Sequence, residues 1–148
     1  MKNFFKASVL LACSAAMMLS QAPAYADNDA TAPLYRGLGE RAGIAAIIHD
    51  FLPLLVADPR ISAAFVDADM ERLGLMLTEQ FCELSGGPCH YSGKNMSDTH
   101  SEMKISNAQF NALAEDLQTA MDKHDITSAN QNKLLAKLAP MQRVIVSK

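Results

Sequence analysis

The sequence predicts an all-α fold, on three observations. Apolar residues recur at the three- and four-residue spacing of helices in several segments of the chain. Capping signatures precede two of these segments. No stretch alternates apolar and polar residues for long enough to form a strand. The chain has 148 residues, which is the length of a single domain.

The first 26 residues have the features of a secretory signal peptide. Lys2 and Lys6 start a segment whose residues 7–19 are uncharged, which is shorter than the ~20 apolar residues of a membrane span. A small-residue cleavage site, Ala24-Tyr25-Ala26, follows. We therefore expect cleavage after Ala26 and a periplasmic or secreted protein with no membrane span. The alternatives are a buried N-terminal helix and a lipoprotein cleaved at Cys13.

Cleavage would make the chain more acidic and leave two cysteines. The removed segment has two lysines and no acid, so the formal charge would fall from −3 to −5. This charge offers no basic field for a phosphate backbone, so sequence-independent nucleic-acid binding is not expected. Cys82 and Cys89 would remain, in a compartment that permits disulfides. They flank the turn at Gly86-Gly87, so we expect them to pair, with two free thiols as the alternative.

The mature chain is expected to begin with a polar leader, residues 27–33, followed by one helical domain, residues 34–148. Apolar residues at helical spacing predict the first helix over residues 44–56. Pro53 lies inside this helix and should kink it or remove one hydrogen bond. Asp58-Pro59 ends it.

The middle of the chain predicts a short segment and a long helix. The short segment covers residues 61–65, and either Asp67 or Asp69 could cap the helix after it. That helix is expected over residues 70–84, on an apolar stripe at positions i, i+4, i+8 and i+11, formed by Leu73, Leu77, Phe81 and Leu84. A loop over residues 88–95 follows the glycine turn.

Three further helices are expected after the loop. A short one covers residues 97–103. Ser106 with Gln109 forms a capping box for the second, and Ser128 with Gln131 caps the last. Pro140 should bend this last helix.

The four histidines do not form a recognisable catalytic or zinc motif. His49, His90, His100 and His124 are scattered one to a segment, whereas a zinc site needs three or four clustered ligands. The sequence also lacks a glycine-rich phosphate loop and a Gly-x-Ser-x-Gly motif. Hydrolytic enzymes are therefore not favoured.

The segment from Gly86 to Ile105 resembles the group 1 truncated haemoglobins. It contains a Gly-Gly pair, a Tyr91-Ser-Gly93 loop and a short helix that presents His100 four residues after Met96. The resemblance extends over nearly the whole mature chain, through residues 34–39, 57–65 and 138–141. The order and spacing of these segments carry it, since no single motif is decisive.

The resemblance implies a truncated globin fold, a two-over-two helical sandwich around haem. His100 would hold the iron, and neutral imidazole is a usual haem ligand. Its other ring nitrogen should donate to a nearby backbone carbonyl. Because the chain has no Cys-x-x-Cys-His motif, the haem is expected to be haem b, bound without a covalent link.

The resemblance also supplies residues for the haem slot, each of which could instead be an ordinary core residue. Phe65 matches the residue that stacks on haem. Arg72 and Lys94 match positions that hold the propionates, and could equally be solvated charges. The apolar candidates are Phe51, Leu52, Phe65, Leu73, Leu77, Phe81, Met96 and Phe110.

The gas-binding side departs from the family pattern. Group 1 members commonly place a Tyr on helix B and a Gln on helix E to hold dioxygen, whereas the matching positions here are Leu52 and Leu77, with Leu73 beside them. Loss of such a donor costs about 1–3 kcal/mol. We expect fast oxygen release and weakened NO dioxygenase or peroxidase-like activity. Gln80, Tyr91 or a water could supply another donor.

The expected function is therefore reversible binding of oxygen, NO or CO, with a reductase of unknown identity as partner, rather than enzymatic catalysis. His49 is either a sixth ligand or a surface residue, and His90 is expected to be a surface residue. His124 ends a helix, where a positive charge suits the dipole. The alternative function is a haemless exported adaptor that binds a partner helix.

Overall fold

The computed structural model describes residues 32–146, and this part of the chain is helical as predicted. The predicted signal peptide, Cys13 and nearly all of the leader lie outside the described residues. Within residues 32–146, no helix has the length and apolarity needed to cross a membrane. The elements in order are α1 (Ala32–Gly37), α2 (Glu40–Ala57), η1 (Ser62–Phe65), α3 (Met70–Leu84), α4 (Met96–His100), α5 (Asn107–Lys123), α6 (Ser128–Leu138), η2 (Ala139–Met141) and α7 (Gln142–Ile145).

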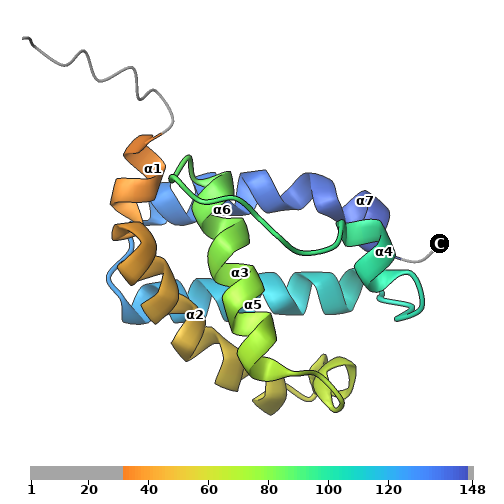
Figure 1. The fold of residues 1–148 in the computed structure, drawn as a ribbon. Coiled ribbons are helices and arrows are strands. Elements are labelled where there is room, and N and C mark those ends of the chain that lie inside the picture. The colour runs from red at the N-terminus through yellow and green to blue at the C-terminus, as the bar shows by residue number, and fades with distance from the viewer. Residues whose placement is uncertain (1–31, 147–148) are drawn as a thin grey trace, which may run out of the picture.

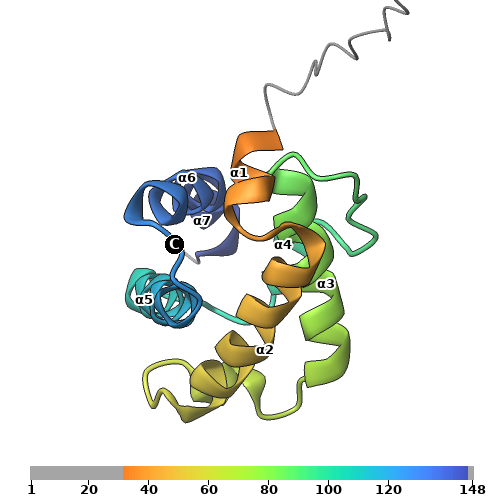
Figure 2. The same ribbon diagram turned by 90° about the vertical axis from the view of Figure 1, so that its left-hand side faces the viewer.

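Four long helices form two layers (Figure 1). In Figure 2, α2 and α3 lie on the right, and α5 and α6 lie on the left, seen nearly end-on. Helix α2 packs against both α3 and α5, and α6 packs against α3 and α5. This arrangement is the predicted two-over-two sandwich. The short helix α4 lies outside the two layers and packs against α7.

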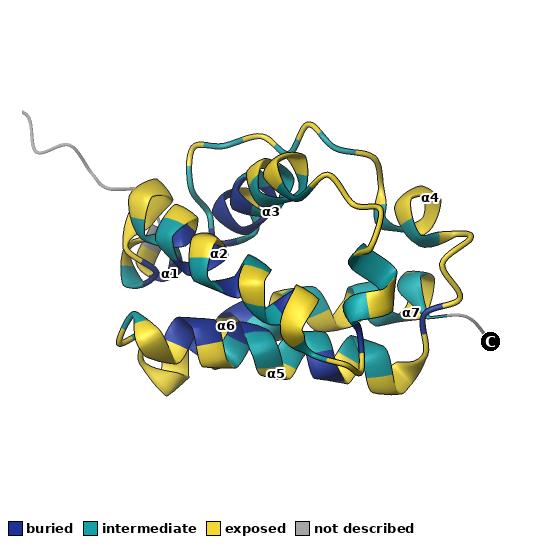
Figure 3. Ribbon diagram, turned by 90° about the horizontal axis from the view of Figure 1, so that it is seen from below, coloured by how far each residue is buried: buried dark blue, intermediate teal, exposed yellow. Residues whose placement is uncertain are grey.

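The protein core occupies one end of the sandwich. Figure 3 shows buried residues concentrated around α1, α2, α3 and α6, whereas α4 and α7 carry half-buried and exposed residues. The apolar face of α2 supplies much of this core, and α5 and α6 face it with Leu117, Met121 and Leu134. Neither α4 nor α7 contains a buried residue. The residues of α4 and α7 are thus less buried than those of the core end of the sandwich.

The N-terminal helices differ from the prediction. The first long helix starts at Glu40 rather than Ile44, and α1 precedes it without having been predicted. Gly39 adopts a left-handed conformation, with φ of 79°, which lets the chain turn from α1 into α2 within two residues. Pro53 is accommodated inside α2, which continues to Ala57.

Some of the predicted helix caps are confirmed by the structure and others are wrong. Asp69 caps α3, and Ser106 with Gln109 forms the predicted capping box of α5. Helix α4 covers Met96–His100 rather than residues 97–103, because Asn95 caps it one residue earlier. The last capping box is wrong: Thr127 caps α6, and the Gln131 amide donates to Asp122 and to the Ile126 carbonyl. Pro140 was expected to bend one last helix, whereas the structure ends α6 at Leu138 and places Pro140 in the 3-10 segment η2 before α7.

A cluster of charged residues connects the end of α2 to α5. It consists of Asp58, Arg60, Glu115 and Asp116. The Arg60 guanidinium contacts Asp58 at 2.7 Å and also binds Glu115. Hydrogen bonds from Arg60 lower the pKa of Asp58. Burial, reinforced by the negative charge of Asp58, raises the pKa of Asp116. The Asp116 Oδ2 atom is buried without a hydrogen-bond partner, so a charge on this carboxyl is unfavourable.

We expect Asp116→Asn to increase the free energy of unfolding at neutral pH, by no more than about 1 kcal/mol because the carboxyl is only partly shielded from water. The raised pKa means that the folded state keeps this proton longer than the unfolded chain, whose value is near 3.8. Stability therefore falls as pH rises from about 4 through the raised pKa. The gain from Asn should vanish near pH 3, where both states are protonated. Urea unfolding at about pH 3 and pH 7 checks this, and an equal gain at both would contradict it.

Candidate functional site

His100 ends the short helix α4 with an oriented imidazole. Its side chain is half-buried, and Nδ1 lies 2.8 Å from the carbonyl oxygen of Met96, one turn earlier. A carbonyl can only accept, so this bond requires a proton on Nδ1, and in the neutral imidazole the lone pair is then on Nε2. The predicted bond from this ring to a backbone carbonyl is confirmed. The arrangement leaves one nitrogen of a fixed ring able to bind a metal.

Most of the predicted slot residues retain free apolar surface. Phe51 and Phe81 are the exceptions, at 0% and 3% exposed, and both pack into the protein core. Large apolar side chains such as these are most often buried in a folded protein. The other candidates are only half-buried. The half-buried candidates come from five elements, and they are Leu52, Phe65, Leu73, Leu77, Met96 and Phe110. The first four also pack partly against the protein core. A flat apolar group could cover this surface.

The three leucines of the predicted gas-binding side come from two crossing helices. Helix α2 carries Leu52, and α3 carries Leu73 and Leu77. Gly74 allows the close approach, since a Cβ atom there would lie 3.0 Å from Leu52 Cδ1. The structure therefore brings Leu52 against the turn of α3 on which the other two leucines lie.

Two of the predicted alternative donors already have partners. The Tyr91 hydroxyl donates to the carbonyl oxygen of Lys94. The Gln80 amide nitrogen lies 3.4 Å from Met96 Sδ and 3.9 Å from Met141 Sδ. Met141 was not predicted as a site residue, because its proximity arises from contacts between segments far apart in the sequence.

The predicted propionate ligands lie at the surface. Arg72 and Lys94 are both exposed. Burial and the charge of Glu79 raise the pKa of Tyr91, and the positive charge of Arg72 opposes this rise. Arg72 follows the cap of α3, whereas Lys94 lies in the loop that precedes α4. Both cations are available to an anionic group on this side of the molecule.

The other three histidines take part in surface interactions. His49 has a side chain that is 86% exposed and contacts Asp50, which favours the surface interpretation over the sixth-ligand one. His90 contacts Glu83 at 3.1 Å. His124 caps the end of α5, and its Nε2 atom lies 3.0 Å from the Asp50 carboxylate. Across residues 32–146, no three His, Cys, Asp or Glu side chains are grouped so as to bind a metal ion by themselves.

The loop between α3 and α4 is fastened to α3 at three points. Cys82 and Cys89 form the predicted disulfide, with Cα atoms 5.7 Å apart. The Glu83 carboxylate accepts from the backbone N–H of Tyr91. The Glu79 carboxylate accepts from the hydroxyl and backbone N–H of Ser92, and these bonds lower the pKa of Glu79. The loop that leads to His100 is therefore held in place.

Removing the disulfide should lower the free energy of unfolding by about 2–3 kcal/mol, from the entropy of the eight-residue loop that it closes. Urea unfolding of a Cys82→Ala/Cys89→Ala double variant measures this loss. A reductant should destabilise the wild-type chain similarly and leave the variant unchanged. Two alkylatable thiols in the unreduced wild-type protein would contradict the prediction.

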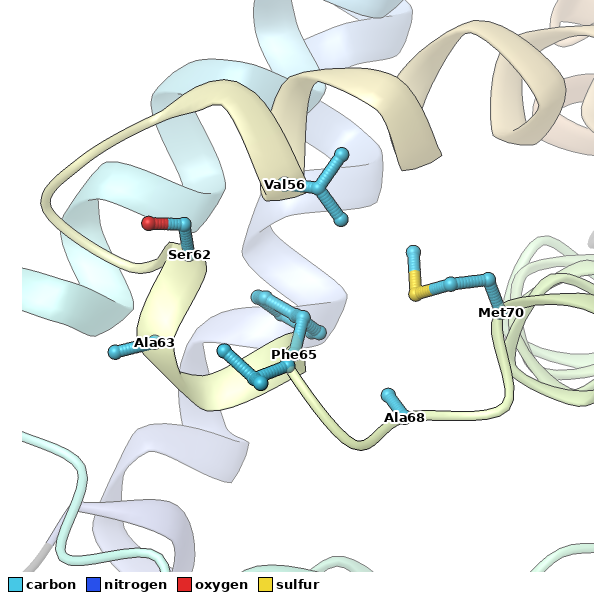
Figure 4. Close-up of a pocket in the computed structure, with 7 residues that line it drawn as sticks. Val56, Ser62, Ala63, Phe65, Ala68 and Met70 are labelled. Atoms are coloured by element: carbon cyan, nitrogen blue, oxygen red, sulfur yellow. The ribbon is translucent and has the colours of Figure 1, made fainter.

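A separate hollow of about 660 Å³ lies between the end of α2, η1 and the start of α3. Figure 4 shows Val56 and Met70 extending toward the space beside Phe65. Its remaining lining residues are Ser62, Ala63, Val66 and Ala68. Of the predicted slot residues, only Phe65 lines this hollow. The hollow is therefore separate from the candidate site and adjoins it through Phe65.

Comparison with known proteins adds a family and several relatives. The family model described as bacterial-like globin matches residues 33–147. A group 1 truncated haemoglobin of Tetrahymena pyriformis is 32% identical over 100 residues, covering 68% of this chain and 83% of the relative. One from Mycolicibacterium paratuberculosis is 26% identical, covering 74% of this chain and 81% of the relative. The Fe(III) crystal structure of the Tetrahymena protein superimposes with a TM-score of 0.75 at 29% identity, covering 78% of this chain and 98% of that structure.

Proposed function

Because this chain belongs to the bacterial-like globin family, we propose that it is a haem protein in which His100 would hold the iron and which would bind a diatomic gas reversibly. The observation that carries the proposal is the fixed imidazole, whose Nδ1 atom donates to Met96 O over 2.8 Å. The expected gas is oxygen, NO or CO. The haemless adaptor is not favoured, since the family supports haem-based ligand binding.

The residues around His100 fit a haem group. The iron of a bound haem supplies the coordination position for the gas. The hydrogen bond from Nδ1 fixes the plane of the ring. Half-buried apolar side chains of α2, α3, α4 and α5 offer surface to the macrocycle, and its burial there is favourable at roughly 25 cal/mol per Å².

Two cations and one aromatic ring would orient the macrocycle. Arg72 and Lys94 are exposed on the side of the α3–α4 loop and would bind the propionates. Phe65 ends η1 and is half-buried, so that its ring is available to stack. Since the sequence has no Cys-x-x-Cys-His motif, the proposed group is a non-covalent haem b.

The apolar gas-binding side favours reversible binding over catalysis. Leu52, Leu73 and Leu77 have no N–H or O–H group in their side chains, so they cannot donate to a polarised ligand. We propose that oxygen is released quickly and that NO dioxygenase or peroxidase-like activity is weak. Keeping the iron ferrous would require a partner of the reductase class.

We also propose that the protein is exported to the periplasm or secreted. Residues 1–26 have the pattern of a signal peptide, residues 27–33 would form the leader and residues 34–148 the globin domain. The disulfide between Cys82 and Cys89 supports an oxidising compartment.

Titrating the purified protein with haem tests the central claim. We expect one haem per chain, a Soret band, and a shift of this band when the ferrous protein is exposed to CO. The His90→Ala variant serves as a control, since His90 is exposed and its imidazole contacts Glu83 at the surface. A chain that stays colourless when supplied with haem would contradict the proposal.

A further inference from the structure

Gln80 is a buried polar residue in an otherwise apolar region. It lies on α3 three residues after Leu77 and is 8% exposed. Burial of a primary amide is unfavourable unless its groups form hydrogen bonds. The partners of this amide therefore indicate why a polar residue occupies the position.

Both partners of the Gln80 amide are methionine sulfurs from other elements. Nε2 lies 3.4 Å from Sδ of Met96, the first residue of α4, and 3.9 Å from Sδ of Met141, in η2. A thioether sulfur is a weak acceptor, and the amide nitrogen has two hydrogens to donate. One side chain of α3 thus links α3 to both α4 and η2.

Met96 is in turn connected to the imidazole of His100. Its carbonyl oxygen accepts the bond from His100 Nδ1. Helix α4 has five residues, none of them buried. A helix of this length has no stability of its own, so its position depends on contacts with neighbouring elements.

We propose that Gln80 is a positioning residue for His100. Its amide holds Met96 in place, and the Met96 carbonyl then sets the direction of the imidazole. The proposal rests on the proposed function only in assuming that His100 binds iron. It differs from the possibility that Gln80 donates to bound dioxygen, because here the Gln80 amide nitrogen lies against the two sulfurs.

The first part of the proposal is that the Gln80 amide holds Met96, and with it α4, in place. Hydrogen exchange of the α4 backbone amides, measured on the full chain with and without added haem, tests this part. We expect Gln80→Leu and Met96→Leu each to speed exchange in α4 by about two- to tenfold, the range of one lost hydrogen bond. The double variant should be no faster than either single one, since both remove the same interaction. Thr78→Val is the matched control: Thr78 is equally buried on α3, at 8% exposed, but its hydroxyl bonds to Gly74 in the same helix.

The second part of the proposal is that the Met96 carbonyl sets the direction of the His100 imidazole. Resonance Raman spectroscopy of the ferrous haem form tests this part. The iron–histidine stretching frequency should shift in Gln80→Leu and Met96→Leu and stay unchanged in Thr78→Val. A merely structural role for Gln80 would lower stability without moving this band. Should Gln80→Leu fail to fold, Met96→Leu decides alone, because that swap nearly conserves volume.

Two outcomes would overturn the proposal. One is unchanged α4 exchange in both variants. The other is an unshifted iron–histidine band together with a changed oxygen dissociation rate in Gln80→Leu, which would make Gln80 a donor to the gas. If the wild-type chain binds no haem, the proposed function fails, whereas the exchange data still test the link from Gln80 to α4.

Discussion

Replacing His100 by glycine is expected to abolish the histidine-ligated haem spectrum, and added imidazole should restore it. The imidazole of His100 is oriented by its bond to the Met96 carbonyl, 2.8 Å away, and no other histidine has a comparable position. Loss of a partner in the outer shell of a metal site weakens metal binding by about 10- to 100-fold. Loss of the ligand itself should weaken haem retention by more than this. Absorption spectra and the rate of haem transfer to an acceptor protein provide the measurement.

The histidines at the surface provide controls for this experiment. His90→Gly changes an exposed residue of the preceding loop, where the side chain contacts Glu83, and it should leave the spectrum intact. An unchanged spectrum in His100→Gly would assign the iron to another residue. His49→Ala in the same background would then show whether His49, despite its 86% exposed side chain, acts as the ligand.

The sequence predicts the long helices because their signals are local. The stripe of Leu73, Leu77, Phe81 and Leu84 and the capping box of Ser106 with Gln109 depend only on residues within a few turns. The box assigned to Ser128 and Gln131 has the same pattern but is wrong, because the N-cap residue is Thr127, whose side chain accepts from the Asn130 N–H. The Gln131 amide nitrogen instead donates to Asp122 and to the Ile126 carbonyl.

The candidate site divides in the same way between local and long-range features. The sequence predicts a bond from the His100 ring to a nearby backbone carbonyl, and the structure identifies the acceptor as Met96, four residues earlier in the same helix. The contact between Gln80 and Met141 joins residues 61 positions apart, so no local pattern of residues indicates it. Phe51 and Phe81 were assigned to the slot but are buried in the core. Core and slot both require apolar residues at helical spacing, and only the packed structure distinguishes them.

Introducing a donor on the gas-binding side should slow oxygen dissociation strongly. Leu77 is half-buried on α3, near the crossing where Gly74 lies against Leu52. We expect Leu77→Gln to place an amide N–H beside the bound gas. Bound dioxygen carries partial negative charge, and a hydrogen bond to it contributes about 1–3 kcal/mol, which corresponds to roughly 5- to 150-fold slower release. Flash photolysis or stopped-flow mixing measures this rate.

Leu77→Met is the matched control, because methionine has a similar volume and no N–H group. Its oxygen dissociation should stay near the wild-type rate, which separates hydrogen bonding from a change of shape. Dissociation of CO, a less polarised ligand, should change far less than that of oxygen in Leu77→Gln. If the wild-type chain already releases oxygen slowly and Leu77→Gln has no effect, a donor other than these leucines must contact the gas. In that case Tyr91→Phe and Gln80→Leu would identify the donor. Either side chain would have to leave its present partner, Lys94 O or the methionine sulfurs, to reach the gas.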